Sequence, residues 1–382
     1  MLEVLLTSFI SFLITFLAIP AIIKIADHKK LYDVPDGRKL HTKPIASLGG
    51  VGMFCGFFFA SLLFVPAQTN PEFQYFFAAA VVIFFLGLKD DILVITPLKK
   101  FLGQVGAAAL LIHLGGLRID SMHGLLGVQQ LPELFSIALT YVTIIVVVNA
   151  YNLIDGVDGL AGTLGLLTMS IFGTYFFMAD VPAYALLSFA VAGSLAAFLI
   201  FNFNPAKIFM GDSGSLMLGL MNAIMVIKFI QIGDTAAVAY PIESVVAIAV
   251  AILMVPLADT LRVFSIRIAQ GRSPFSPDRN HIHHLLLDRG LNHRYVTLCC
   301  LLLNIFFITL AYFGRALGPT YLLLSMITVT FSMLGMLLYF KKPVKRAVIA
   351  TAHPIMHTTT VMTEQPATKV VAMKPEMAIA EN

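Results

Sequence analysis

The chain has 382 residues and a formal net charge of +4; 58% of its residues are hydrophobic and only 12% are charged. A soluble globular chain is about 45–50% apolar and about 25% charged, so this composition excludes an ordinary soluble enzyme and a disordered protein. Lysines and arginines lie beside apolar runs, where lipid and topology explain them, so a nucleic-acid partner is not indicated.

Eleven apolar segments follow one another along the chain. A run of about 18 or more apolar residues can cross a bilayer. The charge-free stretches predict helices over residues 4–23, 45–67, 73–88, 101–117, 134–148, 160–178, 182–201, 215–230, 236–258, 295–313 and 319–340. The third, fifth and eighth are short for a hydrocarbon core about 30 Å thick, so we expect their polar neighbours at the membrane face. The sequence therefore predicts an all-α, polytopic integral membrane protein with about 11 transmembrane helices.

The distribution of lysine and arginine orients these helices. Of the 25 such residues, 22 lie in the tail or in loops that follow odd-numbered segments, and Lys228 lies near the end of the eighth segment. The opposite side holds only Arg118 and Arg315. Cytoplasmic loops carry the excess of lysine and arginine in membrane proteins. We therefore expect the N-terminus outside and the C-terminus in the cytoplasm.

Four polar clusters interrupt the apolar pattern, and each follows an odd-numbered segment. In chain order they are Asp90-Asp91, NAYNLIDGVDGLAG, FMGDSGS and SPFSPDRNHIHH. Ionisable residues at membrane depth are costly and are usually functional. Since the predicted topology puts all four clusters on the cytoplasmic face, they predict one site that contacts both cytoplasmic solutes and lipid.

The first cluster places two adjacent carboxylates at the C-terminal end of a helix, where the helix dipole disfavours anions. A solvated pair that simply ends a span is the alternative. Against it, Lys99 and Lys100 return at the start of the next segment. Two carboxylates that face two ammonium groups suit a bound metal–phosphate complex.

The second cluster is the most specific of the four. Asn149 and Asn152 are three residues apart and share a helical face, and Asp155-Gly and Asp158-Gly repeat a turn-forming unit. A polar loop whose aspartate caps the next helix is the alternative. Two asparagines and two aspartates exceed what a cap needs, and their oxygens are the ligands that Mg²⁺ or Mn²⁺ prefers.

The third cluster puts Asp212 and two serines at the start of the eighth segment. Helix N-termini with free N–H groups bind phosphate, although Asp212 could equally be a plain helix cap.

The fourth cluster could bind zinc, but its histidines lack the defined spacing and the four ligands of a zinc site. With Arg272 and Arg279 close by, recognition of phosphate and sugar is favoured.

These four strings, in this order, resemble the polyprenyl-phosphate N-acetylhexosamine-1-phosphate transferases, and the resemblance covers residues 4–340. The loop SPFSPDRNHIHHLLLDRG is most similar to the bacterial undecaprenyl-phosphate N-acetylglucosaminyl 1-phosphate transferases, which start O-antigen and enterobacterial common antigen synthesis. Ile282 interrupts the three successive histidines that are usual in the peptidoglycan branch, which argues against that branch. IASLGG lacks the arginine that the family often has there, so no role is transferred to this segment.

The resemblance implies transfer of N-acetylglucosamine-1-phosphate from UDP-GlcNAc to undecaprenyl phosphate, with release of UMP, at the cytoplasmic face of a bacterial inner membrane. It implies Mg²⁺ or Mn²⁺ held by Asn152 and Asp212, and a catalytic set of Asp90, Asp91 and Lys100. It implies a nucleotide-sugar site of Asn149, Asp155, Asp158, Arg272, Arg279, His281, His283 and His284, with Asp158 on the uracil. Residues 1–340 would form the transferase domain, and residues 341–382 a basic, disordered cytoplasmic tail.

The chemistry of phosphoryl transfer agrees with this interpretation, because such a reaction needs charge neutralisation and alignment more than covalent help. The accepting phosphate monoester has a second pKa of about 6 and is mostly dianionic near pH 7. We therefore expect Asp90 to position the acceptor rather than to remove a proton, and we expect a single displacement through a ternary complex.

Two other interpretations stay open at this point. A cation-coupled transporter would place its charges near the bilayer midplane and would often show repeats, whereas these charges lie at one face and the sequence shows no internal repeat. Another donor, such as UDP-N-acetylfucosamine or UDP-bacillosamine, fits the same residues. The expected partners are UDP-GlcNAc, undecaprenyl phosphate and membrane lipid, with no nucleic acid; a homodimer is left open.

Overall fold

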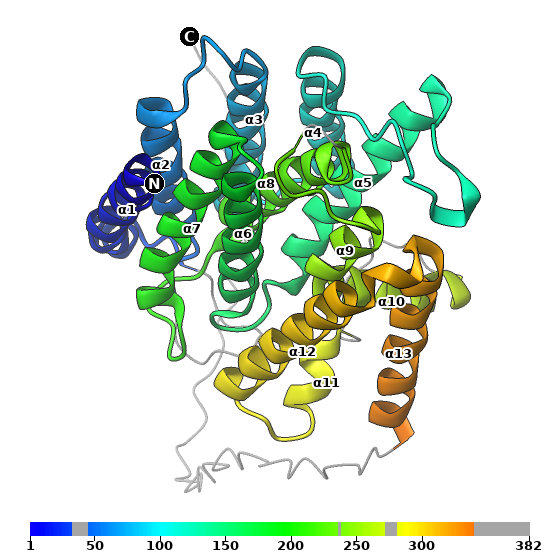
Figure 1. Cartoon of the computed structure of the whole chain (residues 1–382). Coiled ribbons are helices and arrows are strands. Elements are labelled where there is room, and N and C mark those ends of the chain that lie inside the picture. The colour runs from blue at the N-terminus through cyan, green and yellow to red at the C-terminus, as the bar shows by residue number, and fades with distance from the viewer. Residues whose placement is uncertain (33–44, 236–237, 272–280, 340–382) are drawn as a thin grey trace, which may run out of the picture. The chain divides into compact units, whose positions relative to one another are not determined.

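A computed structural model describes residues 1–32, 45–235, 238–271 and 281–339, in which helices are joined by loops and there is no β-strand (Figure 1). The predicted tail, residues 341–382, lies outside the described residues. The long helices are α1 (Leu2–Lys29), α2 (Gly49–Phe64), α3 (Glu72–Ile92), α4 (Pro97–Ala109), α5 (Glu133–Ile154), α6 (Leu160–Met178), α7 (Pro182–Asn202), α8 (Gly211–Ile232), α9 (Val245–Ile252), α10 (Met254–Ala269), α12 (His293–Gly314) and α13 (Pro319–Tyr339). The six-residue α11 (Ile282–Leu287), a π-helix at Leu110–Leu114 and two 3₁₀ turns at Leu125–Gly127 and Arg315–Leu317 complete the set.

Each of the eleven predicted segments overlaps at least one helix. Seven helices are long and apolar enough to cross a membrane, or eight if α9 and α10 form one bent span. The all-α, multi-pass prediction is therefore confirmed for the described residues, while the count of eleven spans and the orientation of the termini stay predictions.

The three segments that looked short are full-length helices. α3, α5 and α8 have 21, 22 and 22 residues. The polar residues that end the apolar runs belong to the terminal turns of these helices: Asp90 and Asp91 close α3, Asn149 and Asn152 close α5, and Asp212 opens α8. These five candidate residues are thus held by helix backbone rather than by loops, which fixes their positions more tightly.

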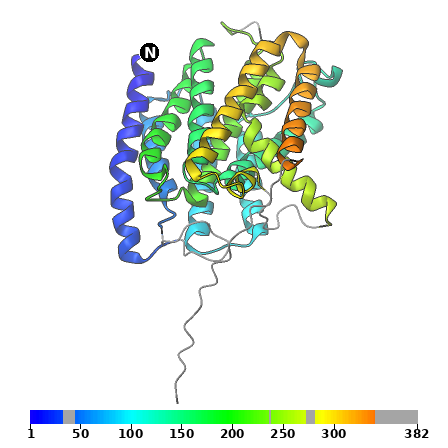
Figure 2. The ribbon, with the colours of Figure 1, turned by 90° about the horizontal axis from the view of Figure 1, so that it is seen from below.

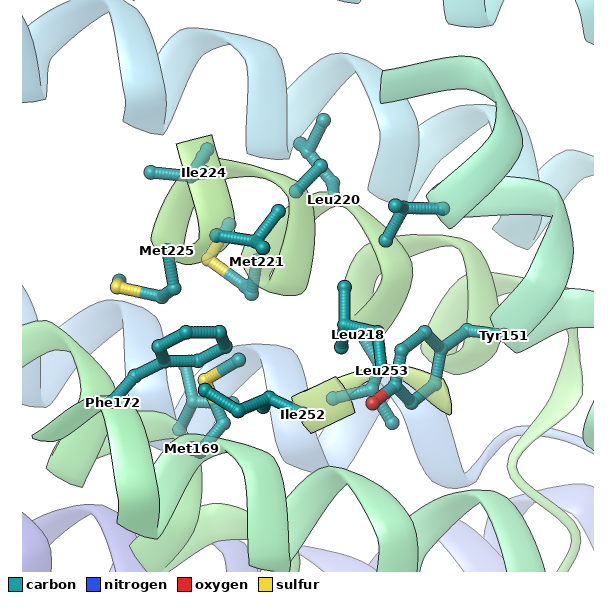
Figure 3. Close-up of a cluster of buried hydrophobic side chains, with 14 of the residues drawn as sticks. Tyr151, Met169, Phe172, Leu218, Leu220, Met221, Ile224, Met225, Ile252 and Leu253 are labelled. Atoms are coloured by element: carbon teal, nitrogen blue, oxygen red, sulfur yellow. The ribbon is translucent and has the colours of Figure 1, made fainter. Parts of the chain in front are cut away.

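α8 lies at the centre of the helices, where it packs against α2, α3, α5, α6, α7 and α9 (Figure 1). Of its 22 residues, 17 are buried. Figure 3 shows how its apolar side chains meet residues from α5, α6 and the α9–α10 junction; the labelled residues are Tyr151, Met169, Phe172, Leu218, Leu220, Met221, Ile224, Met225, Ile252 and Leu253. A helix buried on all sides has no polar face, and α8 after its first turn is apolar except for Asn222, Lys228 and Gln231.

α1 contrasts with α8, since only five of its 28 residues are buried. Small hydroxyl side chains form its inner face: Ser11 Oγ donates to the Ala190 carbonyl at 2.6 Å, and Thr15 Oγ1 donates to the Gly52 carbonyl at 3.2 Å. Small residues allow helix backbones to approach closely in membranes. Figure 2 shows α1, blue and marked N, at the edge of the helices, with its other side turned outward.

α9 and α10 meet at a bend of 80°. Pro256 has no N–H, so in a continuous helix the Ile252 carbonyl would lack its partner. Asn304 of α12 supplies what is missing: its Nδ2 donates to the Ile252 carbonyl at 2.9 Å, and its Oδ1 accepts from the Val255 N–H at 3.0 Å. The predicted segment 236–258 therefore contains a bend that its hydropathy does not indicate.

Candidate active site

The start of α8 is locked against α2 and α3 by glycines. The Gly49 and Gly50 N–H groups donate to the carbonyls of Phe209 and Met210 at 2.9 and 2.8 Å. A Cβ on Gly50 would collide with the backbone of Gly214, and one on Gly87 would lie 2.5 Å from the Ser213 nitrogen. Since neither position has room for a side chain, these glycines fix where α8 begins.

Asp91 caps this helix start from α3. Its Oδ1 accepts from the Asp212 N–H at 2.7 Å, and its Oδ2 accepts from the Ser213 N–H at 3.0 Å and from Ser213 Oγ at 2.7 Å. A carboxylate at a helix N-terminus satisfies unpaired N–H groups and matches the helix dipole. The alternative that Asp212 is a plain helix cap is therefore wrong. α8 begins at Gly211, and the Asp212 side chain is available for other contacts.

Lys100, on α4, joins three of the other predicted residues. Its Nζ lies 3.1 Å from Asp90 Oδ2 on α3 and 3.4 Å from Asn152 Oδ1 on α5, and it forms an ion pair with Asp212 on α8. Four helices thus bring one ammonium group, two carboxylates and one amide together. Lys99 is exposed and takes no part in this cluster.

The two predicted metal ligands are neighbours. Asn152 Nδ2 donates to Asp212 Oδ1 at 2.7 Å and to Ser215 Oγ at 2.9 Å. Asn149, one helical turn earlier, points to a different partner: its Nδ2 donates to Gln104 Oε1 of α4 at 2.8 Å. Gln104 was not predicted, and only its polarity within an apolar segment could have indicated it. Ser215 belongs to the predicted FMGDSGS cluster, where it was given no role of its own.

Asp155 and Asp158 occupy the turn between α5 and α6, outside the helices. Loss of surrounding water raises the pKa of Asp155 well above its ordinary value, and the nearby carboxylates of Asp212, Asp91 and Asp158 raise it further. Asp155 therefore lies near three other carboxylates, and a bound cation would relieve the repulsion between them.

Asp158 is held by groups that the sequence did not indicate. Its Oδ2 accepts from Asn204 Nδ2 at 2.8 Å, and its Oδ1 lies 3.1 Å from His293 Nδ1, at the start of α12. Burial acts to raise the pKa of Asp158, but the hydrogen bonds from His293 and Asn204 outweigh burial and hold that pKa below its ordinary value. His293 follows a loop on the predicted cytoplasmic face, and that shared face is the signal that could have found it.

The histidine segment reaches the same turn. His281 and His283 are buried, His284 is half-buried, and the His283 and His284 ring centroids lie 4.4 Å apart. A Cβ on Gly156 would lie only 2.7 Å from His283 Nε2, so His283 packs directly on the turn between Asp155 and Asp158. Arg272 and Arg279 fall outside the described residues, and their predicted roles stay predictions.

Acid should destabilise the protein through His283. Burial lowers the pKa of His283 from 6.5 to about 3, although Asp259 acts in the opposite direction. Below pH 6.5 this histidine is therefore protonated in the unfolded chain and neutral in the folded chain. The contribution of His283 to the free energy of unfolding falls as the pH falls from 6.5 toward 3. We expect His283 to lower the free energy of unfolding by about 2 kcal/mol between pH 7 and pH 5.

The measurement is the free energy of unfolding in detergent for the wild type and His283→Gln across this pH range. Asp155, with its raised pKa, acts in the opposite direction in both proteins, so only the difference between them reports on His283. Equal pH slopes in the two proteins would show that His283 is protonated in the folded state.

Comparison with known proteins identifies the family. The sequence profile of glycosyl transferase family 4 matches residues 73–230, which include Asp90, Lys100, Asn152 and Asp212. The decaprenyl-phosphate N-acetylglucosaminephosphotransferase of Mycobacterium leprae (strain TN) is 35% identical over 311 residues, covering 75% of this chain and 77% of the relative.

Two further relatives carry the undecaprenyl name. The probable undecaprenyl-phosphate N-acetylglucosaminyl 1-phosphate transferase of Bacillus subtilis (strain 168) is 33% identical over 306 residues, 78% of this chain and 82% of the relative. The undecaprenyl-phosphate alpha-N-acetylglucosaminyl 1-phosphate transferase of Pasteurella multocida (strain Pm70) is 36% identical over 297 residues, which cover 76% of this chain and 80% of the relative. The chain therefore belongs to glycosyl transferase family 4, and within it to the polyprenyl-phosphate N-acetylhexosamine-1-phosphate transferases that its four polar strings resemble.

Proposed function

We propose that this enzyme transfers N-acetylglucosamine-1-phosphate from UDP-GlcNAc to undecaprenyl phosphate, giving undecaprenyl-diphosphate-GlcNAc and UMP. The reaction would take place at the cytoplasmic face of the inner membrane, as the first membrane step of O-antigen or enterobacterial common antigen synthesis. The observation that carries the proposal is the convergence of Lys100, Asp90, Asn152 and Asp212 from four helices at one point.

This cluster matches the charges of the reactants. Donor diphosphate and acceptor phosphate are both anionic, so their approach requires positive charge at the reacting atoms. Lys100 is a cation held by Asp90 and Asp212, and it can transfer its hydrogen bonds from these carboxylates to the diphosphate. Asp90 also accepts from the Ile95 N–H at 2.8 Å, which fixes its carboxylate beside the ammonium group.

The residues also fit a divalent cation. Asp212 and Ser215 both accept hydrogen bonds from Asn152 Nδ2, so the three side chains are neighbours. Together they offer a carboxylate, an amide oxygen and a hydroxyl, which is a donor set for Mg²⁺ or Mn²⁺. Asn152 Oδ1 and an oxygen of Asp212 contact Lys100 here, so a bound ion would compete with the ammonium group for these oxygens. When bound, the ion would supply charge neutralisation at the donor diphosphate.

The remaining residues would hold the reactants. We assign the uridine and sugar to the Asp155–Gly159 turn and the histidine segment, and the lipid phosphate to the Asp90 side of Lys100. Asp91 already accepts three hydrogen bonds from the start of α8, so it would act by holding Asp212 rather than as a nucleophile. That assignment favours a single displacement. A transporter is not favoured, because the relatives are transferases.

The direct test is product identification. Purified protein is incubated with undecaprenyl phosphate, Mg²⁺ and, separately, UDP-GlcNAc and a panel of other UDP-N-acetylhexosamines, and the lipid product is identified by mass. We expect a GlcNAc-diphosphate lipid from UDP-GlcNAc and little product from the other donors.

Decaprenyl phosphate serves as the matched acceptor control, since one relative carries that name. A product formed only from another UDP-sugar would replace the donor and keep the reaction class. No lipid product from any donor, with protein that stays folded, would contradict the proposal.

A further inference from the structure

A fully buried carboxylate lies outside the Lys100 cluster and has no role in the function proposed above. Asp259, on α10, is 1% exposed. Both of its oxygens are used by the histidine segment: Oδ1 accepts from the Ile282 N–H at 2.6 Å, and Oδ2 lies 2.8 Å from His281 Nδ1. A buried charge is tolerated only where it is paired and hydrogen-bonded, so Asp259 and the start of α11 hold each other in place.

Packing continues from this pair to the turn between α5 and α6. The rings of His281 and His283 are stacked, with centroids 5.2 Å apart and planes 9° apart. His283 in turn lies against Gly156, since a Cβ added to Gly156 would lie only 2.7 Å from His283 Nε2. His283 Nδ1 has no hydrogen-bond partner within the described part of the chain, so its ring is held by packing and by its approach to Asp259 Oδ2 at 4.0 Å.

A metal site is the alternative arrangement for these residues. One ligand atom from each of Asp259, His281 and His283 lies within 4.8 Å of the others. The ligands of a tetrahedral zinc ion are about 3.3 Å apart, because each bond is about 2.0 Å long. The 2.8 Å between His281 Nδ1 and Asp259 Oδ2 is instead the length of a direct hydrogen bond. The geometry therefore favours a hydrogen-bonded pair with a stacked second ring.

We propose that Asp259 is a positioning residue for the nucleotide-sugar site. By fixing His281 and the Ile282 backbone, it holds His283 against Gly156 and so holds the Asp155–Gly159 turn in the conformation that receives the donor. This inference rests on the proposed function, because that function assigns the turn to the nucleotide-sugar.

Asp259→Asn is the test variant, since the amide keeps the volume and can still accept from the Ile282 N–H. It cannot accept from His281 Nδ1 as the carboxylate does, so the bond to the ring is lost or reversed. The matched control is Asn304→Leu, which removes two buried hydrogen bonds from the same end of α10 and leaves the histidine segment untouched.

Hydrogen–deuterium exchange gives a readout that needs no donor. In Asp259→Asn we expect exchange in the peptide over residues 155–160 to rise by about tenfold, because local opening becomes easier. In Asn304→Leu we expect the increase around residues 252–258 instead. Unchanged exchange over 155–160 in Asp259→Asn, or an equal increase in the control, would overturn the proposal.

Steady-state kinetics supplies the second readout. We expect Asp259→Asn to raise KM for the donor by about tenfold and to leave KM for undecaprenyl phosphate within about twofold, since the turn contacts only the donor. An equal rise in both KM values would mean a merely structural role. Stoichiometric zinc in the purified wild type, lost in the variant, would also overturn the proposal by making Asp259 a metal ligand.

These outcomes separate the inference from the proposed function. If the product assay assigns another UDP-sugar, the exchange result is unaffected and the KM comparison is made with that donor. If the enzyme makes GlcNAc-lipid but Asp259→Asn changes neither exchange nor donor KM, the inference fails while the function stands.

Discussion

Replacing Lys100 with methionine should lower kcat by about 10²–10³, the usual effect of removing one charge-stabilising group from a phosphoryl- or acyl-transfer site. Lys100 is the cation that contacts Asp90, Asn152 and Asp212 in this structure. Without the ammonium group, the two carboxylates lose their counter-charge. The diphosphate of the nucleotide-sugar also loses a group that would donate hydrogen bonds to it. The measurement is the initial rate of lipid product formation at saturating substrates.

Metal titration adds a second, opposite expectation for the same variant. The ammonium group occupies oxygens of the proposed metal ligands, so its removal should let Mg²⁺ bind at a lower concentration even though turnover is slow. Lys99→Met is the matched control, because Lys99 is adjacent and exposed. A Lys100→Met enzyme with at least about a third of wild-type kcat would contradict the role assigned to Lys100.

The adjacent aspartates should respond differently to the same substitution. Asp91→Asn loses acceptor capacity at the start of α8 and leaves a buried N–H or hydroxyl unsatisfied, so we expect unfolding to become easier by about 1–3 kcal/mol and activity to be lost as Asp212 moves. Asp90→Asn keeps an oxygen for the Ile95 N–H and loses the ion pair with Lys100. We therefore expect Asp90→Asn to lose activity with little change in melting temperature.

Thermal unfolding and activity, measured side by side on both variants, test this division. The two residues serve as controls for each other, because they are neighbours in sequence at the end of the same helix. If Asp91→Asn melts with the wild type while Asp90→Asn is destabilised, the assignment of cap and ion-pair partner is reversed. A labelled phosphosugar trapped on Asp91 would show that Asp91 is a nucleophile after all.

The sequence was sufficient to predict that four polar residues from separate helices lie together, while their roles in a site stay predictions. Asp90, Lys100, Asn152 and Asp212 are rare polar residues at the ends of long apolar runs, and the topology rule put these ends on one face. Because helix ends on one face of a bundle are close together, the structure brings the four side chains into contact. The all-helical fold followed from the same apolar runs.

Other features depend on tertiary contacts that no local pattern indicates. Gln104 and Asn149 pair across two helices, and His293 reaches Asp158 from 135 residues later in the chain. Asp259 looks like a single acidic residue near the end of an apolar run, and only the fold shows that it holds the histidine segment. The bend at Pro256 was also missed, since the hydropathy of the segment continues through it.

The glycine contacts at the start of α8 have a consequence for enzyme engineering. Gly50 and Gly87 leave no space around the backbone of Ser213 and Gly214. The start of α8 therefore cannot shift to accommodate a bulkier or differently shaped sugar. If the nucleotide-sugar binds where we propose, adaptation to a new donor must then come from the turn beside Gly156 and from the histidine segment. A library that randomises these two stretches and leaves α8 intact is the efficient route to altered donor choice.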